Sequence, residues 1–172
     1  MFPPGCVLPA GWSNNTEGSQ LGWIAASDSA NEGRCSLKSG AIGDSGSDSI
    51  KVASRISVTG NYLAGSVSFA RRVSSENTFD CFRFAIDGVQ QNVGGQCSAA
   101  GGIGASGAVP WGNIEVPVSA GRHTLTWSYE KDANTADGDD AVWIDDVRLP
   151  AEGLLLTVTK TGTGTGTVTG TG

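Results

Sequence analysis

One carboxylate stands out because its position in the chain would place it among apolar side chains. Residues 141–150, Ala-Val-Trp-Ile-Asp-Asp-Val-Arg-Leu-Pro, read as a β-strand, and one face of it would carry Ala141, Trp143, Asp145, Val147 and Leu149. Burying a carboxylate is costly unless it is paired. The chemistry open to Asp145 is therefore to bind a cation or to accept hydrogen bonds from backbone N–H groups.

A second group of carboxylates lies in residues 132–140, Asp-Ala-Asn-Thr-Ala-Asp-Gly-Asp-Asp. It departs from the EF-hand pattern, because the second and third ligand positions fall out of register and no Glu closes the loop. Asp, Asn and Gly in such density favour turns that are held by their own side-chain oxygens. We expect a solvated turn here rather than a metal loop.

Catalytic chemistry has little support in the sequence. His123 is the single histidine, and it lies in phase with Leu125 and Trp127, which favours a histidine at the edge of the core. A Ser-His-Asp triad would have to use it, but the chain lacks a Gly-x-Ser-x-Gly motif. The 17 acidic residues offer many carboxylate pairs for glycoside hydrolysis, and nothing selects one of them. We therefore expect no enzyme and assign no catalytic residue.

The elements that would position these residues are β-strands. Segment 121–132 alternates His123, Leu125, Trp127 and Tyr129 with polar residues, which is typical of a half-buried strand. Further strands are expected at 35–39, 50–53, 61–70, 79–88 and 114–118, separated by turn-forming residues. No window has a helical period. The sequence predicts an all-β fold, an antiparallel two-sheet sandwich with almost no helix.

Composition limits the partners. The net charge is −6, and the 11 basic residues are scattered, which argues against nucleic-acid binding. No apolar run approaches the length of a membrane span, so no membrane insertion is expected. The length suits one domain at 1–153, followed by a Thr/Gly-rich segment at 154–172 that we interpret as a linker or as the start of a truncated following module.

Four cysteines allow three pairings, and a Cys/His zinc site is disfavoured because no Cys-x-x-Cys occurs. Two disulfides formed in an oxidising compartment are the better interpretation. We favour Cys6–Cys35 and Cys81–Cys97, because each pair closes a short loop, although the sequence alone does not establish the connectivity.

Five segments, taken in their order along the chain, resemble a known family. They are 39–44 (Ser-Gly-Ala-Ile-Gly-Asp), 73–76 (Val-Ser-Ser-Glu), 84–88 (Phe-Ala-Ile-Asp-Gly), 121–132, and 143–147 (Trp-Ile-Asp-Asp-Val). The series resembles a jelly-roll module of secreted and surface-bound bacterial proteins. That module is similar to cleaved-adhesin domains and, more remotely, to MAM domains. The resemblance covers roughly residues 9–150 and implies a two-sheet antiparallel jelly roll.

The resemblance also implies adhesion or ligand binding beside other modules, often with a structural calcium ion. Asp145 matches the family's Ile-Asp position, and Asp28 and Glu32 lie in a loop that the family places near the last strand. We therefore predict Asp145, Asp28 and Glu32 as calcium ligands. One departure is that related modules often open with Phe-Glu, whose Glu can ligate calcium, whereas Phe2 is followed here by Pro3.

These observations lead to the hypothesis of a non-catalytic extracellular or cell-surface module that binds a surface glycan or a protein ligand. One alternative is a carbohydrate-binding module attached to a secreted enzyme. For that role Trp111 and Tyr62 would be exposed and would stack on sugar rings, although packing in the core or at a sheet edge is the alternative for both and is the favoured interpretation for Trp111. Another alternative is a building block of a stalk or filament that self-assembles through its edge strands.

Overall fold

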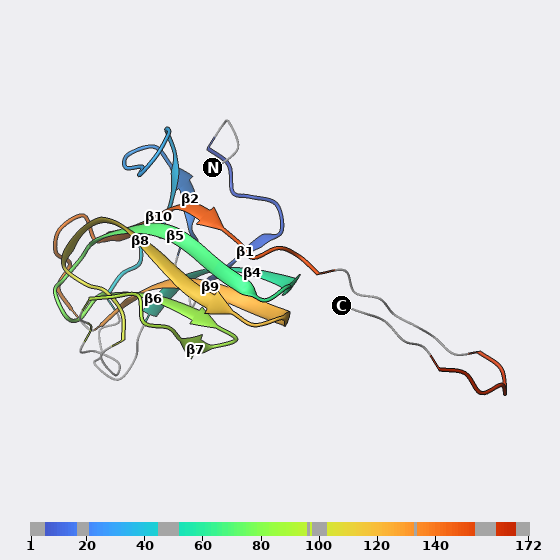
Figure 1. The fold of residues 1–172 in the computed structure, drawn as a ribbon. Coiled ribbons are helices and arrows are strands. Elements are labelled where there is room, and N and C mark those ends of the chain that lie inside the picture. The colour runs from blue at the N-terminus through green and yellow to red at the C-terminus, as the bar shows by residue number, and fades with distance from the viewer. Residues whose placement is uncertain are drawn as a thin grey trace.

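Two five-stranded sheets pack face to face in the computed structural model of the chain, which describes residues 6–16, 21–44, 52–95, 97, 103–132, 134–153 and 161–167 (Figure 1). The first sheet has the order β1 (Trp12–Thr16), β4 (Val52–Tyr62), β9 (Gly121–Lys131), β6 (Cys81–Ile86) and β7 (Val89–Gln90). The second has the order β2 (Ile24–Ala26), β3 (Ser36–Lys38), β10 (Ala141–Arg148), β5 (Gly65–Ser74) and β8 (Ala108–Val118).

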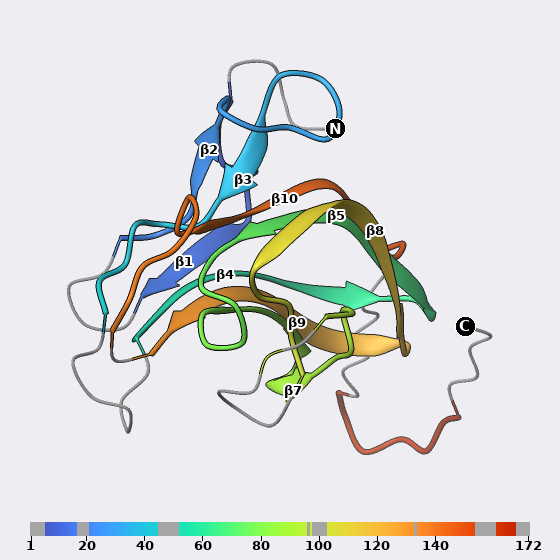
Figure 2. The same cartoon turned by 90° about the vertical axis from the view of Figure 1, so that its left-hand side faces the viewer.

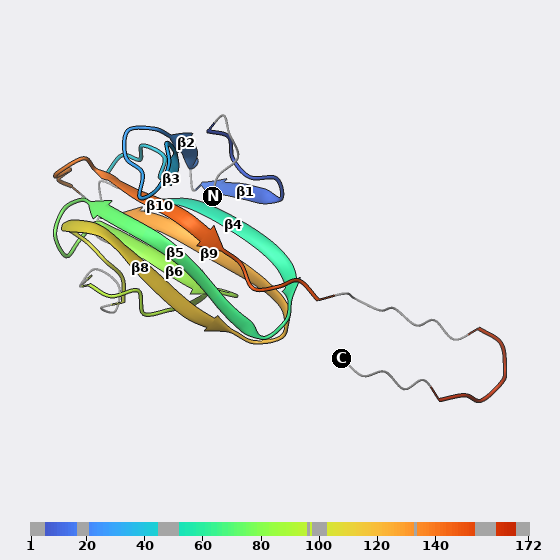
Figure 3. The same cartoon turned by 45° about the horizontal axis from the view of Figure 1, so that its top comes forward.

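All the paired strands in both sheets are antiparallel, and the described residues contain no helix. The expected all-β sandwich is therefore confirmed, and the two layers are seen from other sides in Figures 2 and 3. A search of the described residues for a helix long and apolar enough to cross a membrane also finds none.

The core lies between the sheets and is centred on an aromatic cluster. Trp127 on β9 contacts Phe84 at 5.0 Å and Phe69 at 5.6 Å between ring centroids, so it joins side chains of both sheets. Trp12 stacks on the same indole at 5.0 Å. The inward alternation predicted for 121–132 is confirmed, because Leu125, Trp127 and Tyr129 are fully buried in this cluster.

The predicted face of β10 needs a correction. Val142 and Ile144 point into the core, whereas Trp143 and Asp145 lie on the outer face of the second sheet. The pairing of β10 with β5 shifts between Asp145 and Arg148, and Asp146 has a φ of 50°. Such a bulge adds one residue and reverses the alternation, so Val147 and Leu149 then pack against the core.

Two disulfides join the pairs that the sequence favours. Cys6 is bonded to Cys35 beside β3, and Cys81 at the start of β6 is bonded to Cys97. The second bond holds Cys97 against the outer face of the first sheet, where Cys81 lies.

Both aromatic residues considered for sugar stacking are at least partly covered. Tyr62 is fully buried, with 1% exposure, and Trp111 on β8 is half-buried. Most of the Thr/Gly-rich segment lies outside the described residues, and the part at 161–167 is exposed. The domain boundary at 153 stays a prediction.

Candidate functional site

Asp145 lies at the bulge of β10, beneath the segment that joins β2 to β3. Its Oδ2 accepts hydrogen bonds from the backbone N–H groups of Asn31 at 2.9 Å and Glu32 at 3.1 Å. Its Oδ1 accepts the N–H of Asp146 at 2.8 Å, and the residue is only 1% exposed. Strand β10 thus anchors the β2–β3 segment to the outer face of the second sheet.

Asp28 lies in the same segment but has different partners. Its carboxylate accepts hydrogen bonds from Lys38 Nζ at 2.6 Å and from the indole N–H of Trp143 at 3.1 Å. Burial by itself would raise the pKa of Asp28, and these two donors outweigh it and lower that pKa. The Trp143 ring lies between Lys38, at 5.0 Å, and Arg72, at 4.3 Å.

Of the three predicted calcium ligands, Asp145 and Glu32 are therefore brought together, through the backbone N–H of Glu32. Asp28 is engaged by Lys38 and Trp143 instead. The sequence offered two roles for Asp145, cation binding or acceptance of hydrogen bonds from backbone N–H groups, and the partners observed here are those of the second role. Calcium at Asp145, Asp28 and Glu32 stays a prediction.

A groove of about 410 Å³ lies beside Asp145. Most of the side chains that can hydrogen-bond a ligand there come from three places: the β2–β3 segment, strand β8 and the end of β10. Those side chains are Asn31, Glu32, Asn113, Glu115, Asp146 and Arg148, and Ser68 on β5 adds a hydroxyl group. The arrangement offers amide, carboxylate and guanidinium groups to a polar ligand.

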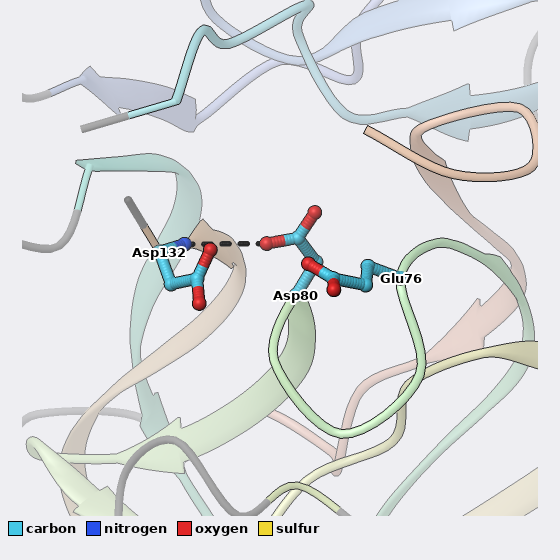
Figure 4. A group of neighbouring side chains, drawn as sticks. All are labelled: Glu76, Asp80 and Asp132. Atoms are coloured by element: carbon cyan, nitrogen blue, oxygen red, sulfur yellow. Dashed lines mark hydrogen bonds between the residues drawn. The ribbon is translucent and has the colours of Figure 1, made fainter. Parts of the chain in front are cut away.

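A second acidic site lies elsewhere and was missed in the sequence. Glu76, Asp80 and Asp132 each place one carboxylate oxygen within 4.8 Å of the others (Figure 4). Asp80 is 0% exposed, and its Oδ1 accepts the N–H of Asp132 at 3.2 Å. Its Oδ2 and Glu76 Oε2 are buried, and neither accepts a hydrogen bond from the described residues.

Lys131 is the cation beside this acidic site, and it is only 1% exposed. Its Nζ contacts Asp140 at 2.6 Å, Asp44 at 3.0 Å and Asp80 at 3.7 Å, so one ammonium group serves three carboxylates. Burial raises the pKa of Asp80 to about 7, against the N–H of Asp132 and the charge of Lys131. Burial and neighbouring carboxylates also raise the pKa of Glu76.

The only histidine joins a hydrogen-bonded chain at the surface. His123 Nδ1 lies 2.6 Å from Asp87 Oδ2, and its Nε2 lies 3.0 Å from Ser119 Oγ. Asp87 Oδ1 also accepts the N–H of Thr124 at 2.8 Å, so the chain fastens the β6–β7 turn to β9. The order Ser-His-Asp is that of a hydrolase triad, and the three side chains come from two hairpin turns and a strand.

Local turns of the expected kind occur in the 132–140 segment, beside bonds that Asp139 and Asp140 make to other elements. Asp132 Oδ1 accepts the N–H of Asn134 at 3.2 Å, and Asp137 Oδ1 accepts that of Gly138 at 2.8 Å. These bonds are short-range and local. Asp132, at the beginning of the segment, belongs to the acidic site, and Asp140, at its end, contacts Lys131 beside that site.

Comparison with solved structures supports the fold. The K1 cleaved adhesin domain of Lys-gingipain from Porphyromonas gingivalis W83 is similar at a TM-score of 0.54 with 14% identity, over 85% of this chain and 94% of that domain. One of the carbohydrate-binding modules of the β-sandwich superfamily is similar at a TM-score of 0.50 with 9% identity, over 80% of this chain and 56% of the other.

The chain also covers 20% of the secreted serine protease VesC from Vibrio cholerae, with 66% of its own length, 12% identity and a TM-score of 0.48. The sequence matches no protein-family model and no curated protein. At these identities the likeness shows the fold alone, and the fold that the resemblance to cleaved-adhesin domains implied is the one observed.

Proposed function

We propose that this chain is a non-catalytic extracellular module of a larger bacterial secreted or surface protein, and that it binds a glycan or protein ligand in the groove beside Asp145. The observation that carries the proposal is the lining of that groove, where amide, carboxylate and guanidinium groups of three separate elements converge. Such groups recognise hydroxyl groups of a sugar or backbone groups of a peptide.

Rigidity of the β2–β3 segment supports this role. Asp145 holds the backbone of Asn31 and Glu32, and the Cys6–Cys35 bond fixes the end of the same segment. A preorganised loop loses less entropy when a ligand binds. The two disulfides also favour an oxidising, extracellular location.

A carbohydrate-binding module is the second candidate, because the groove matches polyhydroxylated ligands and the fold is shared with such modules. Binding by ring stacking has less support. Among the aromatic side chains of the described ranges, Phe79 is the one that is largely exposed, at 45%, and it lies outside the sheets. Recognition by hydrogen bonds in the groove therefore fits both candidates better than an aromatic platform.

The test is binding of the full chain to a glycan array and to immobilised extracellular-matrix proteins. The double variant Asn113→Ala/Arg148→Ala removes an amide and a guanidinium group from the groove. The matched control Asn15→Ala/Arg122→Ala removes the same groups from exposed positions on the first sheet. We expect the wild type and the control to bind with equal affinity. The groove variant should bind at least about tenfold more weakly, which corresponds to a loss of about 1.4 kcal/mol of binding free energy. Equal binding by both variants, or a blank on both panels, would refute the proposal.

The absence of catalysis has its own test, directed at the Ser119–His123–Asp87 chain. An activated serine is labelled by a fluorophosphonate probe. We expect the wild type to be labelled no more than the Ser119→Ala variant. Labelling that depends on Ser119 would make the chain an enzyme. Sedimentation at rising concentration separates the stalk or filament role, which requires growth into larger species.

A further inference from the structure

We propose that Glu76, Asp80 and Asp132 bind one divalent cation of the calcium class, at a site separate from the predicted site at Asp145. Figure 4 shows the three carboxyl groups gathered between the end of β9 and the loop that precedes β6. One oxygen of each lies within 4.8 Å of the others. Two oxygens bound to the same calcium ion lie no farther apart than twice the Ca–O distance of about 2.4 Å.

Proximity of acids alone would not justify a site, but two of these carboxyl groups also have a buried oxygen that accepts no hydrogen bond from the described residues. Asp80 is completely buried, and its Oδ2 accepts no hydrogen bond from the described residues. The buried Oε2 of Glu76 is in the same condition. Buried polar atoms in native proteins are almost always satisfied, so two unsatisfied carboxylate oxygens in one cluster point to a missing partner.

The charge of the surroundings indicates that the missing partner is a cation. Lys131 is shared among Asp44, Asp80 and Asp140 before Glu76 and Asp132 are counted. A divalent ion would offset the remaining negative charge. The ligands are hard oxygen donors, which suit calcium or magnesium rather than zinc or copper, and calcium accepts less regular geometry than magnesium does.

The cradle of the site is fixed by other contacts. Ser75 Oγ donates to the carbonyl of Asp80 at 2.8 Å and accepts the N–H of Gly107 at 3.2 Å. The Cys81–Cys97 bond follows Asp80 directly. A rigid cradle of this kind lowers the conformational entropy that ion binding must overcome.

The position of the site defines its effect. Residues 75–80 connect β5 of the second sheet to β6 of the first, and Asp132 begins the segment that leads from β9 to β10. An ion bound to these side chains would link both sheets at one end of the sandwich. It would also hold the two connecting segments together.

The experiment is calorimetric titration of the chelator-stripped full chain with calcium chloride and, separately, magnesium chloride, at neutral pH and physiological salt. The variants are Asp80→Asn, which keeps an oxygen to accept the N–H of Asp132, and Glu76→Gln, at a half-buried position that should not affect folding. Glu152→Gln and Asp139→Asn are matched controls at exposed positions outside both sites. Circular dichroism verifies that each variant folds.

We expect saturable calcium binding in the wild type with an affinity in the range of about 10⁻⁴–10⁻³ M that is usual for extracellular modules. Loss of an outer-shell partner alone weakens metal binding by about 10–100-fold. Each ligand variant should therefore bind at least about tenfold more weakly, while both controls bind like the wild type. No saturable heat in the wild type would overturn the proposal. So would unchanged binding in Asp80→Asn and Glu76→Gln, or binding that only an Asp145→Asn variant abolishes.

Discussion

Two acidic regions of this domain each bury one carboxylate, but they differ in the number of hydrogen-bond donors that face it. Asp145 is 1% exposed and Asp80 is 0% exposed. Both oxygens of Asp145 accept backbone N–H groups, three in all, whereas Asp80 accepts one N–H and leaves Oδ2 without a donor. Burial alone therefore does not define what an acidic side chain does, because the donors that face it decide between an anchor and a site that attracts a cation.

The two regions also differ in how their neighbouring carboxylates are paired with cations. In the segment that Asp145 anchors, Asp28 is paired with Lys38. Near Asp80, the single ammonium group of Lys131 is divided among three carboxylates. The second region therefore has a surplus of negative charge that an added cation would offset.

Among the variants that distinguish the two regions, Asp145→Ala should change the free energy of unfolding most. It leaves the N–H groups of Asn31, Glu32 and Asp146 without their acceptor. We expect the free energy of unfolding to fall by about 3–5 kcal/mol, measured by urea denaturation with an unchanged m value.

The exposed control for this variant is Asp139→Ala, which should change stability by less than about 0.5 kcal/mol. If Asp145 acts only as a backbone anchor, its loss has the same effect in calcium and in chelator. A loss that grows in calcium would instead support the predicted calcium site at Asp145.

The disulfides beside the two regions provide the next comparison. Replacing both Cys81 and Cys97 by Ala should lower the free energy of unfolding by about 2–4 kcal/mol. Cys6–Cys35 spans 29 residues and Cys81–Cys97 spans 16. Chain entropy alone makes loss of the first bond the costlier by about 0.5 kcal/mol.

Urea denaturation of the two double variants under the same conditions tests this order. A greater loss for the Cys81/Cys97 variant would mean that this bond also supports the loop that carries Asp80. Equal stability of either variant and the wild type would contradict the constraint that the disulfides impose.

A smaller effect, of the opposite sign, is expected at Asp80. In chelator at mildly alkaline pH, Asp80→Asn removes a desolvated charge but keeps an acceptor for the N–H of Asp132. Lys131 keeps Asp44 and Asp140 as partners. We expect the variant to be as stable as the wild type or more stable by about 1 kcal/mol, as determined from urea midpoints.

Asp132→Asn is the companion variant in the same cluster, and it should behave similarly in chelator. Destabilisation of Asp80→Asn by well over 1 kcal/mol without calcium would mean that the Lys131–Asp80 ion pair at 3.7 Å outweighs the cost of burial. The contrast between Asp145 and Asp80 would then disappear.

Most of the fold could be predicted from the sequence, because alternation over strands such as 121–131 reports directly which side chains enter the core. The face of β10 could not, because the bulge at Asp146 reverses the alternation inside a continuous apolar pattern. The sequence placed Trp143 in the core, but its ring lies outside, between Lys38 and Arg72.

The acidic cluster was missed for a different reason. Asp80 and Asp132 are 52 residues apart, and they meet because β6 pairs with β9 with Cys81 opposite Glu130. That register is a tertiary property that no local pattern contains. Once the pairing is known, the acids that flank the ends of the two strands could have been identified as neighbours.

The smallest effect on stability is expected at Asp87, which accepts a backbone N–H as Asp145 does but is exposed. The N–H of Thr124 and then the bond to His123 lower its pKa below the ordinary value of 3.8. The ionised carboxylate of Asp87 therefore contributes to the free energy of unfolding above about pH 4, and this contribution is lost as the pH falls through the folded-state pKa. Asp87→Asn should reduce stability by less than about 1 kcal/mol near pH 6, and urea midpoints near pH 2.5 should match those of the wild type.

The control is Asn92→Ala, which removes a non-titrating acceptor from the N–H of Gly94 and should differ from the wild type equally at both pH values. A difference for Asp87→Asn that persists in acid would show that the side-chain hydrogen bonds of Asp87, and not its charge, stabilise the turn, since Asn tolerates the φ of 51° as Asp does.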